Sequence, residues 1–168
     1  MRRTVSIAAG SALFLAVAGA FSVSAVAADD RGPDEARTLL FDVEFSPQTI
    51  IAANNERDPN SPFSVGDEIV FQDVLLQNGE QVGDEVGSCV LVALAPEVVA
   101  NCSAVFRLAD GDITAQFWNS PGPDPKSVAL TGGTGAYRDI GGEGTLVEFG
   151  DETGTLTLEV LFFKTRNG

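Results

Sequence analysis

The sequence predicts an all-β protein, and most simply an eight-stranded antiparallel β-barrel. Apolar and polar residues alternate with a period of two along most of the chain, as in strands with one buried face. Eight such runs, rich in Val, Phe, Thr and Leu, are separated by short turn segments. The 3.6-residue period of a long helix is not found. A sandwich would also fit, but a closed barrel removes every exposed edge. With about eight strands, its interior would hold side chains or one small ligand.

The predicted strands follow one another with short connections. Four of the turns have the sequences NGEQVGDE, ADGD, NSPGPDP and GDETG, which are rich in turn-forming residues. The longest irregular stretch is 46–67. The predicted strands are residues 39–45, 68–76, 88–94, 101–108, 113–118, 127–131, 144–149 and 155–163.

The first 27 residues predict a signal peptide. Two arginines, Arg2 and Arg3, precede an apolar run, which ends at a small-x-small cleavage signal, Ala25-Val26-Ala27. We therefore expect cleavage after about Ala27 and a secreted, extracellular protein. The alternative is an uncleaved membrane anchor. No later segment approaches the ~20 apolar residues of a spanning helix, so no stable membrane anchor is expected. Residues 28–37 are polar and predict a flexible leader, and residues 38–168 form the barrel domain.

The composition excludes several classes of function. The chain has 24 acidic against 10 basic side chains, a net charge of −14, and would repel phosphate backbones, so nucleic acid is not an expected partner. Histidine is absent, which removes His-dependent catalytic triads and makes a zinc site improbable. The acidic turns lack the ligand spacing of a calcium loop. The sequence thus predicts neither a metal nor a cofactor.

The two cysteines, Cys89 and Cys102, predict a disulfide, because an exported chain meets an oxidising environment. They lie near opposite ends of SCVLVALAPEVVANC, which suggests a hairpin turning near Ala95-Pro96. Symmetric pairing about that turn places the two cysteines opposite each other. A disulfide closing so short a loop should stabilise the fold by roughly 3 kcal/mol.

The glycine-rich stretch TGGTGAYRDIGGEG, residues 131–144, could be a phosphate-binding loop or a turn. A phosphate-binding glycine loop follows a strand and opens a helix, whose N-terminus supplies amide donors. Here another strand follows instead. The sequence therefore favours a barrel corner, where glycines permit positive φ and close backbone approach, with Tyr137 packed into it.

This stretch resembles the allene oxide cyclase and dirigent proteins, which share an eight-stranded barrel. Thr131-Gly132-Gly133-Thr134-Gly135, followed by Tyr137 and by Gly141-Gly142, is similar to the end of a strand in those families. GDEIVF, VGSCVLVALAPE, FRLADGDITAQ and LEVLFF are similar to other segments, so that the resemblance covers about residues 66–163.

The resemblance implies a site inside the barrel. Allene oxide cyclases bind a labile fatty-acid epoxide there, and the pair that helps ring opening resembles Asp42 and Glu44 of FDVE. Their pocket cysteine matches Cys89. Dirigent proteins steer the coupling of oxidised phenols outside cells. We expect Asp42 and Glu44 to be the catalytic pair in the barrel mouth; the alternative is a strand surface that faces solvent.

Further candidates for ligand contact lie on other predicted strands. Phe71 is expected to shape the wall of the site, and Asp73 shares a face with it and with Ile69. A carboxylate on an apolar face needs a partner or a proton. Arg107 could pair with it. Gln116 and Trp118 precede a proline-rich loop and would suit the rim of a ligand site, although simple packing is an alternative role.

These observations leave three hypotheses. In the first, the barrel holds a small hydrophobic, reactive molecule and orients it so that one cyclisation or coupling geometry wins. In the second, it binds such a molecule without turnover. In the third, it is a structural barrel with a filled core. The resemblance also implies that the chain can form a homo-oligomer, a trimer or a dimer.

Overall fold

A computed structural model describes residues 35–53 and 63–163 of this chain, which belong to one compact unit, Gly32–Gly168. The predicted signal peptide and residues 28–34 of the predicted leader lie outside the described residues. Strand β1 begins at Glu35 and so takes up the end of that leader. The elements are β1 (Glu35–Glu44), β2 (Thr49–Ile51), β3 (Glu68–Gln77), β4 (Glu80–Ala93), β5 (Val99–Leu108), β6 (Gly111–Asn119), β7 (Lys126–Gly133), the 3-10 turn η1 (Gly135–Tyr137), β8 (Ile140–Glu148) and β9 (Thr153–Phe162).

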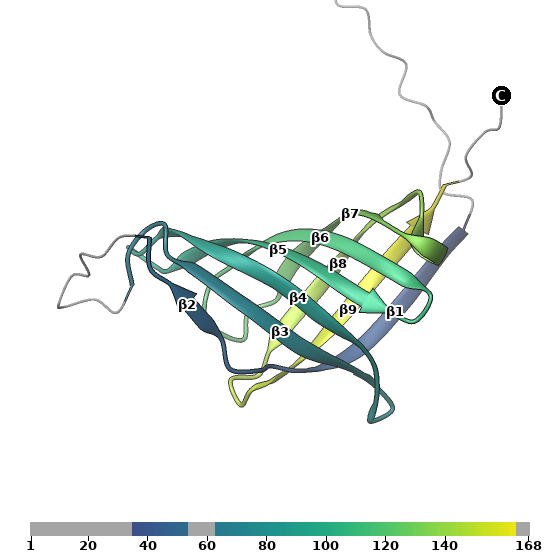
Figure 1. The fold of residues 1–168 in the computed structure, drawn as a ribbon, viewed down its shortest axis with the longest axis horizontal. Helices are drawn as coiled ribbons and strands as arrows, with labels where there is room; N and C mark the ends of the chain where they lie inside the picture. The colour runs from purple at the N-terminus through teal and green to yellow at the C-terminus, as the bar shows by residue number, and fades with distance from the viewer. Residues whose placement is uncertain (1–34, 54–62, 164–168) are drawn as a thin grey trace, which may run out of the picture. The chain divides into compact units, whose positions relative to one another are not determined.

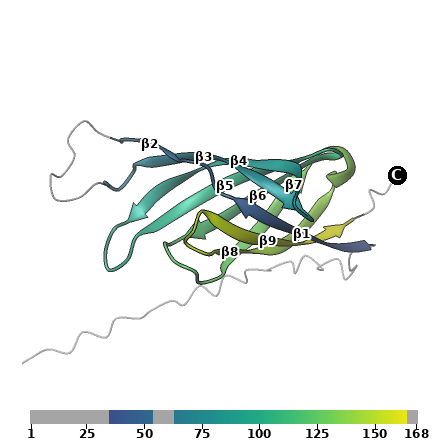
Figure 2. The same ribbon diagram turned by 90° about the horizontal axis from the view of Figure 1, so that it is seen from below.

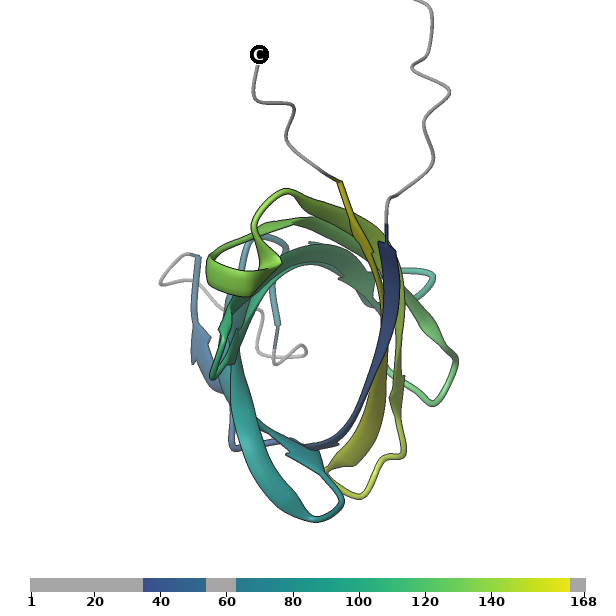
Figure 3. The ribbon, with the colours of Figure 1, turned by 90° about the vertical axis from the view of Figure 1, so that its right-hand side faces the viewer.

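The strands form a closed antiparallel barrel (Figures 1 and 3). From β3 to β9, each strand pairs with the next in sequence. The ring closes through β1, which pairs with β9 along its whole length and with β3 at Asp42–Glu44. The predicted eight-stranded barrel is thus confirmed, with β2 as one additional strand. No helix among the described residues is long and apolar enough to span a membrane.

Strands β1 and β2 share one edge of β3 (Figure 2). The end of β1 pairs with Val74–Leu76, and β2 pairs with Glu68–Val70. The chain bends between the two strands, and there the Ser46 backbone N–H donates to Asp73 Oδ1 at 2.7 Å. The Asp73 side chain therefore accepts a backbone hydrogen bond at the point where the strand pairing along β3 is interrupted. Strand β2 was not predicted because all three of its residues are exposed, so no alternating pattern marks it.

The largest error in the strand predictions concerns β4, which begins at Glu80 rather than Ser88. The segment NGEQVGDE was interpreted as a turn, but only Asn78 and Gly79 turn, with φ of 54° and 79°. Such a two-residue turn is typical of tight hairpins. The pattern misled because β4 carries Glu85 on its buried face, which inverts the expected alternation.

The two ends of the barrel differ in how they are filled. The end that contains the β5–β6 turn and η1, here called the packed end, is closed by large side chains that are at most 2% exposed. The opposite end contains the β4–β5 and β6–β7 connections and is here called the cavity end. The side chains that fill the packed end include Phe41, Leu75, Phe106, Ile113, Leu158 and Val160.

The disulfide and the glycine-rich corner both have the expected form. Cys89 and Cys102 lie directly opposite each other on β4 and β5 and are bonded, with Cα atoms 4.0 Å apart. The glycine-rich stretch passes from β7 through η1 straight into β8, so it contains no α-helix to bind phosphate. A Cβ on Gly133 would lie 2.5 Å from the Tyr137 carbonyl oxygen. Tyr137 packs near Phe162, with ring centroids 6.5 Å apart.

Candidate functional site

The cavity end contains a pocket of about 280 Å³, close to the lower limit for sites that bind drug-sized molecules. Alternation along the strands supplies its wall, since every second residue points inward. Much of the wall is apolar and aromatic. These apolar lining residues are Phe45, Phe63, Ile69, Phe71, Leu91, Val98, Ala100, Phe117 and Leu146, with the disulfide residue Cys89 beside them.

Three carboxyl groups also line this pocket: Asp73 from β3, Glu85 from β4 and Glu148 from β8. Asp73 and Glu85 are directly opposite each other on adjacent strands. Both are almost fully buried, at 3% and 2% exposure. Like charges placed opposite each other in a sheet repel, and burial disfavours ionisation. Burial therefore raises the pKa of both carboxyl groups.

Glu85 shows the stronger effect. Burial is the main cause that raises its pKa to about 8, and the charges of Asp73 and Glu148 raise it further. Its Oε2 atom is buried and makes no hydrogen bond within the described part of the chain. At neutral pH Glu85 is therefore mostly a neutral acid, which can donate a proton or a hydrogen bond.

Asp73 is in a more polar setting. Burial raises its pKa, the hydrogen bond from the Ser46 backbone N–H lowers it, and the charge of Glu148 raises it. The Ser46 bond stabilises the ionised form. The two opposing carboxyl groups are thus unequal: one is held by a backbone donor, and the other lies against apolar surroundings.

Glu148 has partners for both of its oxygens. Lys126 Nζ donates to Oε2 at 3.0 Å, and Asn119 Nδ2 donates to Oε1 at 3.0 Å. Lys126 is only 5% exposed and also donates to the Gly122 carbonyl oxygen. This ion pair between buried Lys126 and partly exposed Glu148 neutralises Glu148 and anchors the β6–β7 connection at the cavity end. The Oδ1 atom of Asn119 is buried without a hydrogen-bond partner in the described chain, so it is a second unused polar group.

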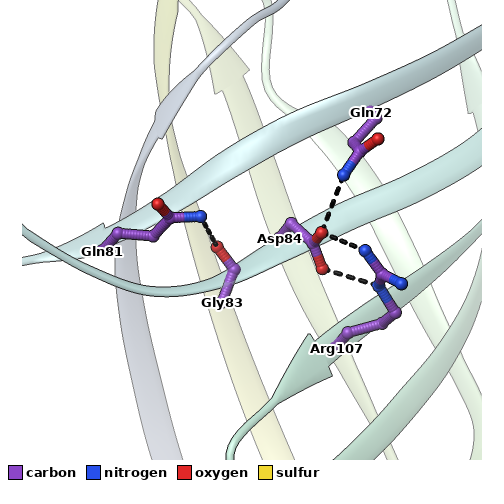
Figure 4. Close-up of polar contacts among 5 residues, drawn as sticks. All are labelled: Gln72, Gln81, Gly83, Asp84 and Arg107. Carbon is purple, nitrogen blue, oxygen red and sulfur yellow. Dashed lines mark hydrogen bonds and ion pairs between the residues drawn. The ribbon is translucent and has the colours of Figure 1, made fainter.

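Arg107 does not pair with Asp73, as had been considered, but with Asp84 on the outer face of the barrel (Figure 4). Its Nε lies 2.7 Å from Asp84 Oδ1, and Gln72 Nε2 donates to Asp84 Oδ2 at 2.9 Å. These contacts, led by the Arg107 hydrogen bond, lower the pKa of Asp84. The reason is register: residue 107 is opposite residue 84, and both side chains point outward.

Of the other predicted ligand-contact residues, two point into the barrel and two point outward, because successive residues of a strand face opposite sides. Phe71 and Asp73 line the cavity. Gln116 and Trp118 are exposed on the outer face of β6, and Trp118 is 68% exposed. The inward residue of that segment is their neighbour Phe117.

The predicted catalytic pair, Asp42 and Glu44, is exposed on β1, whereas Phe41 and Val43 are buried. The structure therefore places both carboxylates on the outer face, as in the solvent-facing alternative, and not in the cavity wall.

The prediction missed Glu85 and Glu148, which carry much of the polar character of the site. A usable signal was present in the sequence. Cys89 was expected to point inward, and Glu85 is four residues earlier on the same strand, so it shares that face. Glu148 likewise shares a face with Leu146. Glu85 was overlooked because it ends the segment NGEQVGDE, which was interpreted as a turn.

The arrangement can do three things chemically: accept an apolar molecule, donate a proton from Glu85, and present a carboxylate from Asp73. Among the residues that the structure describes, no group of three or more His, Cys, Asp or Glu side chains is placed to hold a metal ion.

Comparison with solved structures finds this barrel fold in several other proteins. One is described as pyocyanin demethylase, at 26% identity and a TM-score of 0.64, covering 74% of this chain and 99% of that chain. Another is the pterocarpan synthase dirigent protein GePTS1, at 19% identity and a TM-score of 0.55, covering 80% and 89%. A third is AbnU, an exo-specific intermolecular Diels-Alderase, at 14% identity and a TM-score of 0.54, covering 75% and 98%.

No curated protein sequence matches the chain. A family does match: residues 47–162 fit the allene oxide cyclase barrel like domain. That span includes β2 to β9 and the three carboxyl groups of the cavity, and it agrees with the closed antiparallel barrel described above. The chain therefore belongs to the allene oxide cyclase barrel-like family.

Proposed function

We propose that this protein binds a small, mainly apolar molecule in the cavity end and steers its cyclisation or coupling. The observation that carries the proposal is Glu85: a carboxyl group that is 2% exposed, with Oε2 unpaired in the described chain, in a cavity with an aromatic wall. Leaving a buried polar atom unsatisfied is costly. A ligand with a hydrogen-bonding group would remove that cost.

The mechanism rests on orientation and one acid. Phe71 and Phe117 restrict how a flat molecule can lie, which lowers the entropy cost of reaching a reactive geometry. Protonated Glu85 donates to an oxygen or nitrogen of the ligand and so stabilises negative charge that develops there. Asp73 offsets positive charge that develops elsewhere in the ligand. In a ring closure that is an isomerisation, any proton that Glu85 transfers to the ligand returns to Glu85 from the ligand as the product forms. In a coupling, Glu85 keeps its proton and donates only a hydrogen bond.

The family and the fold support this type of reaction. A dirigent protein and a Diels-Alderase, by their descriptions, use the same barrel, and the protein at 26% identity is described as acting on pyocyanin. The alternative is a carrier that binds the molecule without turnover, which the same cavity would also serve. Chemistry on the bound ligand is what separates the two.

The experiment begins with native mass spectrometry of protein purified from its own host, which identifies a retained small molecule. That molecule, or its precursor, is then incubated with the parent protein and with Glu85→Gln. We expect Glu85→Gln to bind it but to convert it about a hundredfold more slowly. Equal rates would reject Glu85 as the acid. Binding without conversion by the parent protein would establish the carrier.

The same assay decides on Asp42 and Glu44. Their exposure on the outer face leads us to expect that Asp42→Asn combined with Glu44→Gln converts the ligand at the parent rate. A large loss would restore the pair to the active site, as the resemblance implied.

Export and assembly complete the proposal. We propose that the protein is secreted after cleavage near Ala27, and the Cys89–Cys102 disulfide supports an oxidising destination. Intact mass of protein recovered from the culture medium would check the cleavage position. Native mass spectrometry would distinguish the expected trimer or dimer from a monomer.

A further inference from the structure

Among the described residues, the cavity is lined by three acidic side chains, and only one of them has a basic partner. Glu148 is neutralised by Lys126, and its second oxygen is held by Asn119. Within the described part of the chain, Asp73 has no such counter-ion, and its carboxylate accepts a hydrogen bond from the neutral Ser46 backbone N–H. Glu85, directly opposite on β4, is a second acid. The groups that face Asp73 from the neighbouring strands are therefore carboxyl groups.

The basic side chains of the described residues do not supply the missing charge. Arg107 is held by Asp84 on the outer face, and Arg37 pairs with Glu35. Arg138 is exposed beyond η1 at the packed end. Lys126 is committed to Glu148 and to the Gly122 carbonyl. A buried carboxylate without a paired cation is costly, and a bound cation would remove this cost.

The rest of the wall suits a cation that is flat and aromatic. Phe45, Phe63, Phe71 and Phe117 come from four different segments and line the same cavity. An aromatic face attracts a cation through its quadrupole, and more strongly where water is excluded. These rings also stack on other aromatic systems.

We propose that this cavity selects small aromatic cations, such as N-alkylated or protonated nitrogen heteroaromatics, over neutral molecules of the same shape. Asp73 is the residue that determines this preference. The inference rests on the proposed function and specifies the charge class of its ligand. It also sets an exclusion: a ligand carboxylate would lie beside Asp73, where two like charges would be buried together.

Binding of the cation is linked to the proton on Glu85. The charged and titratable groups that face Glu85 are Asp73 on β3 and Glu148 on β8, with Lys126 behind Glu148. A cation placed among them favours ionised Glu85, so binding should release a proton. Affinity for the cation then rises as pH increases from 6 to 8, whereas affinity for a neutral molecule does not.

The test uses three probes of one shape: the N-methylquinolinium cation, neutral 1-methylnaphthalene and the 1-naphthoate anion, titrated into the full-length protein by isothermal calorimetry. We expect the dissociation constant of the cation to be about tenfold lower than that of the neutral probe, and the anion to bind most weakly. Asp73→Asn, which keeps an oxygen to accept the Ser46 N–H, should remove the preference without changing affinity for 1-methylnaphthalene.

Two further variants complete the design. Glu159→Gln removes an exposed acid on the outer face of β9, and it should leave the preference intact, which separates a local effect from the net charge of the chain. Glu85→Gln should keep the preference at pH 6 and abolish its increase toward pH 8. This variant and the three-probe comparison in the parent protein also decide the matter if Asp73→Asn does not fold.

The outcomes separate this inference from the proposed function. If 1-methylnaphthalene binds as tightly as the cation, or if Asp73→Asn retains the preference, the charge selection is overturned and the binding cavity stands. If none of the three probes binds, the proposed binding function fails as well.

Discussion

The two ends of the barrel use the same strands but different interiors. At the packed end, alternation places Leu75, Phe106 and Ile113 inside, all at most 1% exposed. At the cavity end, the same alternation on β3 and β4 places Asp73 and Glu85 inside. The difference teaches that strand geometry decides which residues point inward, while residue type decides whether that end is filled or contains a polar cavity. The packed end supplies stability that the cavity end can lose.

The largest expected effect tests that division directly. Phe106→Ala at the packed end should lower the free energy of unfolding by about 4 kcal/mol, because a buried ring leaves a cavity that closely packed neighbours cannot fill. Phe117→Ala, the matched change in the wall of the existing cavity, should cost about half as much. Urea denaturation of both variants measures the two values. Equal losses would contradict the division into two ends.

The disulfide is expected to matter next. The disulfide lies on the inner face at the cavity end. Packing is incomplete there, and the covalent link compensates for part of the missing packing stability. Replacing both Cys89 and Cys102 by Ala should lower the free energy of unfolding by about 3 kcal/mol. Thermal unfolding with and without a reductant provides the control, since the reductant should destabilise the parent protein and not the double variant. A reductant effect of equal size in both would reject this assignment.

The free energy of unfolding should depend on pH because Glu85 is buried at the cavity end. The pKa of Glu85 is raised to about 8 in the folded protein from 4.5, so the folded state holds a proton that the unfolded state releases. Stability from this group is complete below pH 4.5 and is lost as pH rises toward 8. We expect the parent protein to lose about 2 kcal/mol between pH 6 and pH 8.

Glu85→Gln supplies the matched control, because it removes the titrating group and keeps its shape. Its unfolding free energy should vary much less over the same interval, apart from the smaller contribution of Asp73, whose pKa is also raised. A parent protein whose stability rises over this interval would show that Glu85 is not buried as a neutral acid.

The smallest effect is expected outside the barrel. Asp84 is adjacent in sequence to Glu85, but it faces Arg107 and Gln72 on the outer face (Figure 4). Surface ion pairs contribute little to stability. Asp84→Asn should therefore change the midpoint of thermal unfolding by less than any variant above. A loss of stability as large as that of Phe106→Ala would mean that the contacts of Asp84 with Arg107 and Gln72 stabilise the barrel as much as the packed end does.

The sequence alone predicted the class of fold, the order of the long strands and the disulfide, because each depends on local alternation or on symmetry about a turn. It did not predict β2, which has no buried face. It also shortened β4, where an acid occupies an inward position. Both errors arise where burial is decided by distant strands and not by neighbours in the sequence.

The same limitation explains the site. Phe71 and Asp73 were placed correctly in the cavity wall because their strand has a clear apolar face. Gln116 and Trp118 were expected at a rim, but the parity of β6 points Phe117 inward instead. For Asp42 and Glu44, the sequence did not decide whether their face of the strand points into the barrel or toward solvent. Counting residues from Cys89 would have identified one inward acid, because Glu85 is an even number of residues from Cys89 on the same strand.

The pairing of β1 with β9 has a consequence for how the protein is made. Glu35 and Phe162 are partners in that ladder, although they lie at opposite ends of the described chain. Synthesis runs from the first strand to the last, so β1 must wait for β9 before the ring can close. Contacts so distant in sequence slow folding. Ring closure therefore cannot precede the synthesis of β9, and the cavity, which needs β3, β4, β6 and β8 held in one ring, is completed only when that strand has been added.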